Sequence, residues 1–479
     1  MPEQLSITFA SNRGPLSFVR ADGSYAPAPG VGAVAELLDL LGRSLGSGLR
    51  WIASAVSEDD RAAVRAGACA HACASLPYRA EYLAFEGDVY RHYYDEISNR
   101  ILWFACHDLW DELGVGSPGW GWRDSWGGYD AANRWFAERV ARRADPSSIA
   151  LFHDYHLLTG PKWLKGLRPD VASGLFMHGA WSTEGFQRLP KALVARVVDG
   201  MLGADVVGFH TPGWGDEFLD TCEASGETVD RHLGTVMRDG RRTRVRAYPV
   251  PVDTDRVLAA GHRPEADRWV DRLGRLVKGK LIARADRVEP SKNALRGFQA
   301  FELALERMSE PSEATFVASL LPRRTTMDEY VRYRAQIERT VDDINARFPG
   351  SIRLFLGDDR ERSFAAMRRA DVIFVNSIRD GMNLVAKEGV ILNERNAVLV
   401  ISSTVGAATE LGQAALVIRD PRDVAETAAV LERALAMPAR ERARRSGILR
   451  NLVMSHTPAD WLGELVADLS DRGSETVSG

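Results

Sequence analysis

The sequence predicts an α/β protein made of two doubly wound domains, each a parallel sheet covered by helices, with a cleft between them. Short apolar runs alternate with amphipathic helical stretches along most of the 479 residues, and this alternation is typical of βαβ units with buried parallel strands. There are two such series. The stretch between them is rich in proline and charge and has no strong period, which indicates a domain junction near residues 248–256.

Each predicted strand is a short apolar run, and each predicted helix shows a period near 3.6 residues. The expected strands lie within residues 7–11, 149–158, 173–178, 204–211, 280–287, 314–322, 352–357, 370–377 and 397–403. The expected helices lie within residues 33–45, 294–308, 331–345, 421–447 and 457–471. We therefore expect an N-terminal Rossmann-like domain at 1–250 and a C-terminal Rossmann-like domain at 251–455. Residues 456–479 are expected to form a helix that packs back on the N-terminal domain, followed by a polar tail.

Charge and composition exclude several classes of function. Lys plus Arg is 61 and Asp plus Glu is 65, so the net charge is −4 and the chain lacks the basic excess that non-specific nucleic-acid binding needs. The basic run 439–447 is better explained as a solvated helix face. The first residues do not resemble a signal peptide, and no window reaches about 18 apolar residues, so we expect a cytoplasmic protein without a membrane partner. A homo-oligomer remains open.

The four cysteines indicate neither a disulfide framework nor a metal site. They lack paired regular spacing, which fits a reducing cytosol. Cys69, His71 and Cys73 alternate in an alanine-rich run that we interpret as a strand, and no second ligand pair completes a tetrahedral site. We expect no metal and no cofactor.

Two clusters near the N-terminus have the composition of phosphate-binding loops. Arg13, in SNRGP directly after the first strand, can bind a phosphate through two parallel hydrogen bonds, although a solvated surface arginine is equally consistent with the motif. Gly30 and Gly32 precede the helix that starts near Ala33. The pattern GxGxxA fails as a dinucleotide fingerprint because the nearest expected strand ends near Ala10, so what remains is a backbone loop that can approach a phosphate or sugar closely.

Cationic residues follow the strand at 280–287. This strand end and the loop after it carry Arg284, Arg287 and Lys292. Two cations five residues apart, Arg287 and Lys292, suit a diphosphate that gains negative charge as it leaves, and a structural ion pair is the alternative.

The string DGMNLVAKE follows the strand in 370–377 and is more specific than its parts. Asp380 and Gly381 form a turn, and Asn383 and Leu384 open a helix whose N–H groups can point at phosphate. Glu388, about a turn later, can accept hydrogen bonds from the vicinal hydroxyls of a ribose. An acidic residue in such a place is commonly only a helix cap.

Polar and aromatic residues of the first half suggest a sugar site. Tyr94, Trp103, Asp154 and His178 are expected at strand ends beside the proposed cleft, and sugars bind by stacking on aromatic faces and by hydrogen bonds to carboxylates. Taken singly, an aromatic residue or a histidine is more often part of a core.

Taken together, SNRGP, HYYDEISNRILW, FHDYHLL, RADRVEPSKN, LPRRTTMDEY and RDGMNLVAKE resemble the trehalose-6-phosphate synthase family. These are retaining nucleotide-sugar glycosyltransferases with the two-domain GT-B fold. The motifs occur in order along nearly the whole chain, from Ser11 to the region of Trp461. The resemblance implies transfer of glucose from GDP- or UDP-glucose to glucose 6-phosphate, giving α,α-trehalose 6-phosphate.

The resemblance also implies that the domain at 1–250 binds the acceptor and that the domain at 251–455 binds the nucleotide-sugar donor. It further implies roles for individual residues. The residues expected to bind the acceptor are Arg13, Tyr94, Trp103, Asp154 and Arg324. Those expected to bind the donor are Gly30, Gly32, His178, Arg287, Lys292, Asp380, Gly381, Met382, Asn383, Leu384, Val385 and Glu388. Those expected to carry the reaction are Arg287, Lys292, Asp154 and His178.

The chain departs from the family where the family usually reads HIPFP. Here residues 178–182 read HGAWS, so a proline-fixed loop becomes a glycine-containing one with an added indole at Trp181. Because this loop is expected between the two sugars, the departure keeps a second enzyme open. That enzyme is a pseudo-glycosyltransferase similar to validoxylamine phosphate synthase, which couples a nucleotide-cyclitol to an amino-cyclitol phosphate. A third alternative is a non-catalytic sugar-phosphate sensor, against which the retained Arg287, Lys292 and Glu388 argue.

The base of the nucleotide is expected to contact the loop at 357–363. Asp358 and Asp359 can accept from the paired N–H donors of guanine, which slightly favours a guanine nucleotide, but the same residues also fit an N-cap pair for the next helix.

Overall fold

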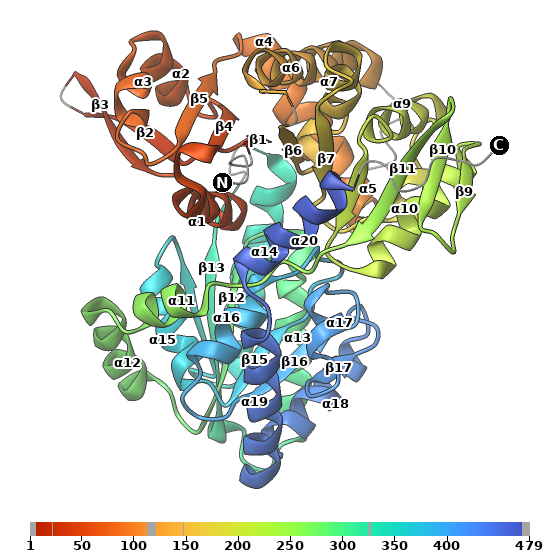
Figure 1. Ribbon diagram of the computed structural model, residues 1–479. Coiled ribbons are helices and arrows are strands. Elements are labelled where there is room, and N and C mark those ends of the chain that lie inside the picture. Colours follow the sequence, from red (N-terminus) through yellow and green to blue (C-terminus); the bar gives the residue numbers. More distant parts are fainter. Residues whose placement is uncertain (1–5, 22, 113–120, 147, 324–326, 472–479) are drawn as a thin grey trace. The chain divides into compact units, whose positions relative to one another are not determined.

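The computed structural model describes residues 6–471 apart from 22, 113–120, 147 and 324–326 (Figure 1). The chain divides into two compact units: unit 1 is Met1–Tyr248 with Pro458–Gly479, and unit 2 is Pro249–Thr457. Each unit is built on one large sheet in which parallel pairing prevails. The predicted α/β class with two parallel-sheet domains is therefore confirmed. Among the described helices, none has the length and apolar character needed to cross a bilayer.

Unit 1 contains a nine-stranded sheet in the order β5-β4-β1-β6-β7-β8-β11-β10-β9. Pairing is parallel from β5 to β11, and β10 and β9 add an antiparallel edge. A separate antiparallel hairpin joins β2 to β3. The strands are β1 Ile7–Ser11, β2 Leu16–Ala21, β3 Ser24–Pro29, β4 Leu49–Ser54, β5 Arg79–Leu83, β6 Ile149–His153, β7 Ala172–Phe176, β8 Val206–Phe209, β9 Thr228–Asp230, β10 Thr235–Arg238 and β11 Arg241–Ala247.

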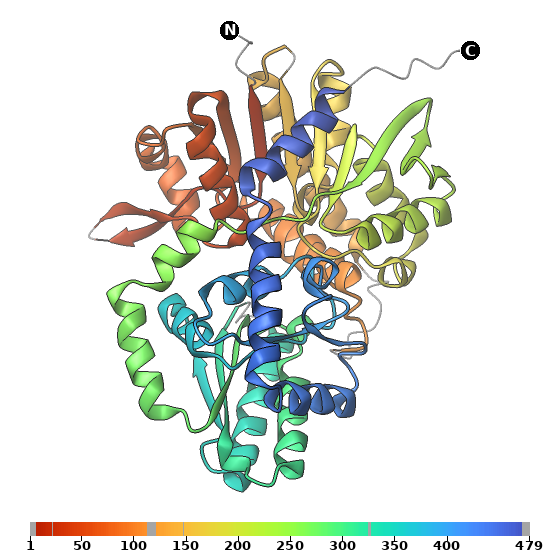
Figure 2. The ribbon, with the colours of Figure 1, turned by 60° about the horizontal axis from the view of Figure 1, so that its bottom comes forward.

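The helices of unit 1 include one long π-helical stretch, Arg91–Leu102, in which Trp103 N–H donates to the carbonyl of Ser98 five residues back. The α-helices are α1 Ala33–Leu45, α2 Glu58–Arg65, α3 Ala68–Cys73, α4 Gly87–Tyr90, α5 Trp103–His107, α6 Trp122–Arg143, α7 Gly160–Leu167, α8 Thr183–Gln187, α9 Lys191–Met201, α10 Pro212–Ala224 and α20 Pro458–Ser470. Two 3₁₀ turns are Gly46–Gly48 and Tyr155–Leu157. Figure 2 shows α20 lying along the sheet of unit 1, where Trp461 is fully buried and donates from Nε1 to the Tyr248 carbonyl at 3.2 Å.

Unit 2 contains a six-stranded, wholly parallel sheet in the order β14-β13-β12-β15-β16-β17. Its strands are β12 Lys280–Arg287, β13 Ala314–Leu321, β14 Ile352–Leu356, β15 Val372–Val375, β16 Val398–Ser402 and β17 Leu416–Ile418. Its α-helices are α11 Thr254–Gly261, α12 Pro264–Leu276, α13 Ala294–Arg307, α14 Asp328–Arg347, α15 Arg360–Arg369, α16 Leu384–Leu392, α17 Ala407–Leu411, α18 Val424–Leu435 and α19 Ala439–Met454, with 3₁₀ turns at Pro290–Lys292 and Pro311–Glu313.

The strand order creates one reversal point in each sheet. In unit 1 the chain extends the sheet one way from β1 through β4 and β5, and the other way from β6 through β7 and β8. In unit 2 the corresponding reversal lies between β12 and β15. Helices leave adjacent strands in opposite directions at such a point, which opens a crevice outside the carboxyl ends of the strands where ligands bind.

Two sequence-based interpretations of local structure were wrong. Residues 68–73 form the helix α3 rather than a strand, and Cys69 and Cys73 pack one turn apart with their sulfurs 4.0 Å apart. The strand nearest to Gly30 does not end near Ala10, because β3 ends at Pro29, directly before it. This strand belongs to the antiparallel hairpin; its sequence, SYAPAP, contains two prolines and none of its side chains is buried. The dinucleotide fingerprint still lacks its parallel strand.

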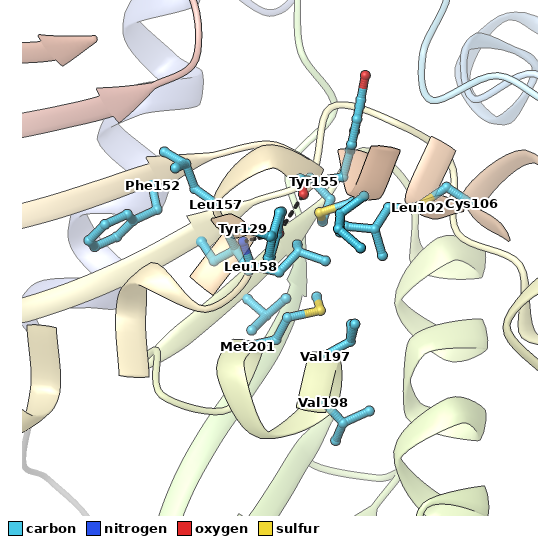
Figure 3. Close-up of a cluster of buried hydrophobic side chains, with 14 of the residues drawn as sticks. Leu102, Cys106, Tyr129, Phe152, Tyr155, Leu157, Leu158, Val197, Val198 and Met201 are labelled. Atoms are coloured by element: carbon cyan, nitrogen blue, oxygen red, sulfur yellow. Dashed lines mark hydrogen bonds between the residues drawn. The ribbon is translucent and has the colours of Figure 1, made fainter. Parts of the chain in front are cut away.

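The core of unit 1 fixes the segment that follows β6. Figure 3 shows Tyr129 of α6 inside a cluster of buried side chains, with its hydroxyl between Tyr155 and Leu158. The Tyr129 hydroxyl donates to the Tyr155 carbonyl at 2.8 Å and accepts from the Leu158 N–H at 3.1 Å. Asn133, one turn along α6, donates to the His156 carbonyl at 3.0 Å. The loop after β6 is therefore held by side chains that cannot move without disturbing the core.

Candidate functional site

Asp154 occupies a strained position at the carboxyl end of β6. Its φ is 73° and its ψ is 170°, a conformation that costs a residue other than glycine about 1–3 kcal/mol. The Asp154 N–H donates to the Phe176 carbonyl at 2.7 Å, and α6 holds the next residues in place. Strain that the surrounding structure enforces is concentrated at functional sites, so the backbone supports a functional role for Asp154.

Tyr94 and Trp103 lie on helices rather than at strand ends, which corrects the prediction. Tyr94 stacks between Tyr90 at 5.3 Å and His156 at 5.7 Å between ring centroids. Trp103 packs on Tyr155 at 5.6 Å. Tyr94 therefore contacts His156 and Trp103 contacts Tyr155, so the π-helical stretch, the start of α5 and the loop after β6 form one aromatic cluster.

Arg13 is exposed at the end of β1, while its neighbour Asn12 is buried. The Asn12 side-chain oxygen accepts from the Ser54 hydroxyl at 3.0 Å and from the Tyr93 hydroxyl at 3.1 Å, which fixes this turn. Burial raises the pKa of the Tyr90 phenol, and the charge of Arg13 lowers it, so Arg13 lies near the Tyr90–Tyr94 stack. Unit 1 thus brings Arg13, Tyr94, Trp103 and Asp154 to the reversal point between β1 and β6.

The two glycines of the loop before α1 differ. A side chain on Gly30 would meet the Gly14 carbonyl oxygen at 2.1 Å. The backbone of Gly30 therefore packs closely against the turn after β1, and not against space for a ligand. The Gly30 N–H also donates to the Pro15 carbonyl at 2.7 Å. Gly32 has φ 117° with open space around it and is the N-cap of α1. Only Gly32 keeps the open backbone that was predicted for a ligand.

His178 follows β7 and contacts two further histidines. Its Nε2 lies 3.2 Å from His153 Nδ1, and its carbonyl accepts from His210 Nε2 at 3.0 Å. Burial lowers the pKa of His153 to about 3 and the pKa of His178 well below its ordinary value, so both rings are neutral near pH 7. His178 is partly exposed, whereas His153 is fully buried.

Trp181, the added indole of the HGAWS loop, points into the core of unit 1. Its side chain is fully buried, stacks on Phe186 at 4.1 Å and donates from Nε1 to Thr221 Oγ1 at 3.0 Å. Ser182 caps α8 by accepting from the Gly185 N–H at 3.1 Å. The indole is therefore part of the core of unit 1.

Arg284 is not available to a phosphate, which corrects its place in the predicted cation cluster. It is fully buried, pairs with Asp286 at 3.0 Å and donates to Asn376 Oδ1 at 2.6 Å and to the Lys292 carbonyl. Burial raises the pKa of Asp286 and the neighbouring Arg284 charge lowers it. Arg284 therefore supports the loop on which Lys292 lies.

Lys292 and Asp380 are brought together at the reversal point between β12 and β15. Lys292 Nζ donates to Asp380 Oδ2, and the same carboxylate accepts from Asn383 Nδ2 at 2.9 Å. Asn383, at φ 64°, also caps the N-terminus of α16 by accepting from the Ala386 N–H. The side chain of Met382 is buried, and Leu384 and Val385 of the first helical turn are partly exposed. Gly381 is close to Gly406, where a side chain would meet the Gly381 oxygen at 1.8 Å.

The other predicted donor residues in unit 2 make separate ion pairs. Arg287 pairs with Glu289 at 3.2 Å, which is the structural alternative considered for this motif, although the arginine side chain stays 46% exposed. Glu388 lies one turn into α16 with its carboxylate 3.6 Å from Arg360. Arg324 lies outside the described residues.

Asp359 acts as the N-cap of α15, as the second interpretation of its loop proposed. Its Oδ1 accepts from the Arg362 N–H at 2.8 Å, and its Oδ2 lies 3.5 Å from Arg362 Nη1. Asp358 is exposed. The two carboxylates therefore do not form a pair directed at a base.

The structure also reveals residues that the motifs contained but that sequence reasoning left unused. His153, Tyr155 and His156 flank Asp154 and join it to the aromatic cluster and to His178. The sequence feature that could have identified them is the run of polar and aromatic residues HDYH at the end of an apolar strand. Over the described part of the chain, no three His, Cys, Asp or Glu side chains converge as a metal site would require.

The chain is similar to known proteins along almost its entire length. Residues 10–471 match the model of glycosyltransferase family 20. A trehalose-6-phosphate synthase of Mycolicibacterium smegmatis is 32% identical over 98% of this chain and 93% of its own length. A probable alpha,alpha-trehalose-phosphate synthase [UDP-forming] of Arabidopsis thaliana is 32% identical over 81% of this chain, which spans about half (48%) of that longer relative.

A relative with another activity is almost as similar. A validamine 7-phosphate valienyltransferase of Streptomyces hygroscopicus is 30% identical over 90% of this chain and 87% of its own length. Among solved structures, an alpha,alpha-trehalose-phosphate synthase (UDP-forming) of Burkholderia xenovorans in complex with glucose-6-phosphate has 26% identity and a TM-score of 0.81, over 97% of this chain and 100% of that one.

Proposed function

Because the chain belongs to glycosyltransferase family 20 and is a glycosyltransferase of the trehalose-phosphate synthase type, we propose that it transfers glucose from a nucleotide-glucose to glucose 6-phosphate. The product is then α,α-trehalose 6-phosphate. Relatives named for this activity match nearly the whole chain.

The observation that carries the proposal is the meeting of Lys292, Asp380 and the N-terminus of α16 at the reversal point of unit 2. A helix N-terminus presents N–H groups to a diphosphate, and a lysine beside it stabilises the charge that develops on departure. The carboxylate of Asp380 can accept a hydrogen bond from a donor-sugar hydroxyl, and that of Glu388, one turn further, is suited to ribose hydroxyls.

The acceptor side of the proposal rests on the aromatic cluster of unit 1. Tyr94 and Trp103 pack on the residues after Asp154, and Arg13 is exposed beside them. An exposed arginine with a phenol and an indole N–H suits a phosphate, and a carboxylate suits sugar hydroxyls. A sugar phosphate fits this combination better than a neutral sugar.

The reaction that we propose retains configuration at the transferred carbon. The acceptor hydroxyl oxygen bonds to C1 of the donor glucose while the bond from C1 to the phosphate oxygen breaks on the same face. The hydroxyl proton passes to a donor phosphate oxygen, and the nucleoside diphosphate leaves. Lys292 and Arg287 stabilise the leaving charge, and Asp154 and His178 align the sugars.

For the donor base we propose uracil. Recognition of guanine would require two carboxylates facing one Watson–Crick edge, but Asp359 caps α15. One remaining acidic residue matches the single ring N–H of uracil better than the paired donors of guanine.

A second candidate is supported by the similarity to validamine 7-phosphate valienyltransferase, whose coverage is nearly as broad. In that case the donor is a nucleotide-cyclitol and the acceptor an amino-cyclitol phosphate. The lost proline and the gained glycine at residues 178–182 are compatible with either substrate pair.

Nucleotide release tests the proposal. The purified protein is mixed with UDP-, GDP- or ADP-glucose, with and without glucose 6-phosphate, and the sugar product is identified by mass and NMR. Acceptor-dependent UDP release with an α,α-linked disaccharide phosphate supports the proposal, and GDP release corrects the base. If no glucose pair reacts but the cyclitol pair does, the second candidate is correct. If neither pair reacts, a sensor is indicated.

A further inference from the structure

His153, which is buried, and His178, which is partly exposed, form a pair of imidazoles at adjacent strand ends. His153 is the last residue of β6, and its partner in the register of β7 is Phe176, two residues before His178. His153 Nδ1 lies 3.2 Å from His178 Nε2. At this distance the two nitrogens share one hydrogen bond, so one of them carries a proton and the other does not.

The surroundings keep both rings uncharged. His153 contacts Phe9 edge-on at 5.3 Å between centroids, and His178 contacts Phe176 at 4.7 Å and His210 at 5.7 Å. These neighbours are aromatic rings without a compensating negative charge, and burial lowers the pKa of both His153 and His178. Each ring therefore has a single proton, which sits on one of its two nitrogens.

The position of the His153 proton follows from its other nitrogen. His153 Nε2 is buried and has no hydrogen-bond partner among the residues that the structure describes. An orphaned buried N–H is rarer in proteins than an under-satisfied acceptor, so the proton belongs on Nδ1. His153 Nδ1 then donates to His178 Nε2, which must be unprotonated. The proton of His178 is consequently on its Nδ1.

His210 supports the same arrangement from the other side. A carbonyl oxygen can only accept, so His210 Nε2 donates to the His178 carbonyl at 3.0 Å. This bond holds the backbone of residue 178, while His153 holds its ring. The His178 ring is thus fixed in place as well as in tautomer.

We propose that His153 is a positioning residue that fixes His178 as the Nδ1–H tautomer, so that His178 donates a hydrogen bond to an oxygen of the donor sugar. This inference rests on the proposed function for the identity of the ligand. The other tautomer would present a lone pair and would require a hydroxyl to donate. A second histidine that sets which nitrogen carries the proton therefore decides which kind of sugar oxygen His178 recognises.

The tautomer is tested by nitrogen NMR on the full chain labelled with ¹⁵N-histidine. Protonated and unprotonated ring nitrogens differ widely in shift, and the His178 signals are identified by their absence in His178→Gln. We expect a protonated Nδ1 and an unprotonated Nε2 for His178. The reverse pattern overturns the inference, whatever the activity of the protein.

Variants at His153 test the consequence for turnover. In His153→Asn the amide N–H takes the place of Nδ1–H, whereas in His153→Gln the amide lies near the position of Nε2. We expect His153→Asn to keep kcat/KM for the donor within about threefold, and His153→Gln and His153→Leu to lower it about tenfold to hundredfold, as removal of a ligand-orienting partner typically does. The acceptor KM should not change.

A merely structural role predicts a different outcome. All three variants would then lose activity in proportion to their loss of thermal stability, and His153→Asn would show no rescue, which overturns the inference. If no substrate pair reacts with the wild-type chain, the proposed function fails, and the NMR experiment still decides the tautomer.

Discussion

Lys292 and Asp380 are joined by an ion pair between the loop after β12 and the loop after β15, with their side chains only 11% and 15% exposed. Asp380 also accepts from Asn383, the residue that caps α16. The cation proposed for the diphosphate and the carboxylate proposed for the donor sugar therefore hold each other in position. A rigid, pre-arranged charge is what stabilises a leaving group without reorganisation during the reaction.

Replacing Lys292 with alanine should lower turnover more than donor affinity. The lysine charge matters most when the diphosphate departs, so we expect kcat to fall about 10²–10³-fold, as on removal of one transition-state donor, with a donor KM changed less than about fivefold. Steady-state kinetics of nucleotide release measure both quantities.

A surface lysine provides the control for this variant. Lys162 is 52% exposed and pairs with Asp199 in unit 1, so Lys162→Ala removes a lysine ion pair away from the proposed donor residues. It should leave kcat unchanged. A Lys292→Ala enzyme with normal kcat and a greatly raised donor KM would show that Lys292 only binds the donor.

The buried histidines should make unit 1 less stable in mild acid. The pKa of His153 is lowered to about 3 in the folded chain from about 6.5 when unfolded, so the unfolded state takes up protons first as the pH falls. The stabilisation is complete above pH 6.5 and is lost as the pH falls from there toward 3. Between pH 7 and pH 5, His153 alone should cost about 2 kcal/mol of unfolding free energy.

Urea unfolding at pH 7 and pH 5 checks this value. The variant His153→Asn has no titrating group at this position, so its loss of stability between the two pH values should be smaller by about 2 kcal/mol. His71 is exposed on α3, and His71→Asn should keep the full wild-type dependence. Equal losses in all three proteins would contradict the role of His153.

The sequence was sufficient for the features that depend on local pattern. The strand 280–287 and the helix 33–45 have the predicted bounds, because continuous apolar runs and a clear helical period define them. The hairpin β2–β3 was not found, since β3 contains two prolines and most residues of the two strands are exposed, so they do not form a buried apolar run. Features that depend on packing between distant segments could not be predicted from one segment.

The same limit explains the errors at the candidate site. Arg284 and Arg287 are three residues apart in one motif, yet one is fully buried against Asn376 and the other is half exposed. Trp181 was interpreted as an addition to a loop because its stacking partner Phe186 and its hydrogen-bond acceptor Thr221 lie outside the motif HGAWS. Motifs gave the segments of the site, and only the tertiary contacts gave the direction of each side chain.

Replacing Asp359 with alanine should weaken the fold without changing the preference for a base. Loss of an N-cap costs about 0.5–2 kcal/mol, and Asp359 caps α15 through the Arg362 N–H. The exposed Asp358 makes a matched control, and Asp358→Ala should be nearly neutral in stability. Thermal unfolding and the ratio of kcat/KM for UDP- and GDP-glucose are measured for both. A ratio that changes in Asp359→Ala would restore Asp359 as a base-reading residue.

Replacing Trp181 with phenylalanine should affect stability rather than substrate choice. The change removes the hydrogen bond to Thr221 and part of a fully buried ring, and we expect a cost of about 1–3 kcal/mol. The half-exposed Trp135 gives the comparison, because Trp135→Phe should change the stability by less than about 0.5 kcal/mol. If Trp181→Phe altered the relative rates with glucose 6-phosphate and a cyclitol phosphate, the indole would have a role in specificity after all.

Replacing Glu388 with glutamine should weaken donor binding without slowing the chemical step. A carboxylate accepts from two hydroxyls, whereas an amide offers one acceptor and one donor, so one charge-assisted hydrogen bond to the ribose is lost. Such a bond contributes about 1.5–3 kcal/mol, and the donor KM should rise about tenfold to hundredfold with kcat little changed. Glu432, which pairs with Arg307 on the surface of the same unit, provides a control in Glu432→Gln.

A donor analogue with a deoxyribose identifies the partner of Glu388. With the wild-type protein, removal of one ribose hydroxyl should raise KM about as much as Glu388→Gln does, because each change breaks the same hydrogen bond. With Glu388→Gln, the deoxyribose donor should then cost little more, since the bond is already absent. If the two losses simply multiply, Glu388 does not contact that hydroxyl. Arg360, whose guanidinium lies 3.6 Å from the Glu388 carboxylate, then becomes the candidate for direct contact with the ribose.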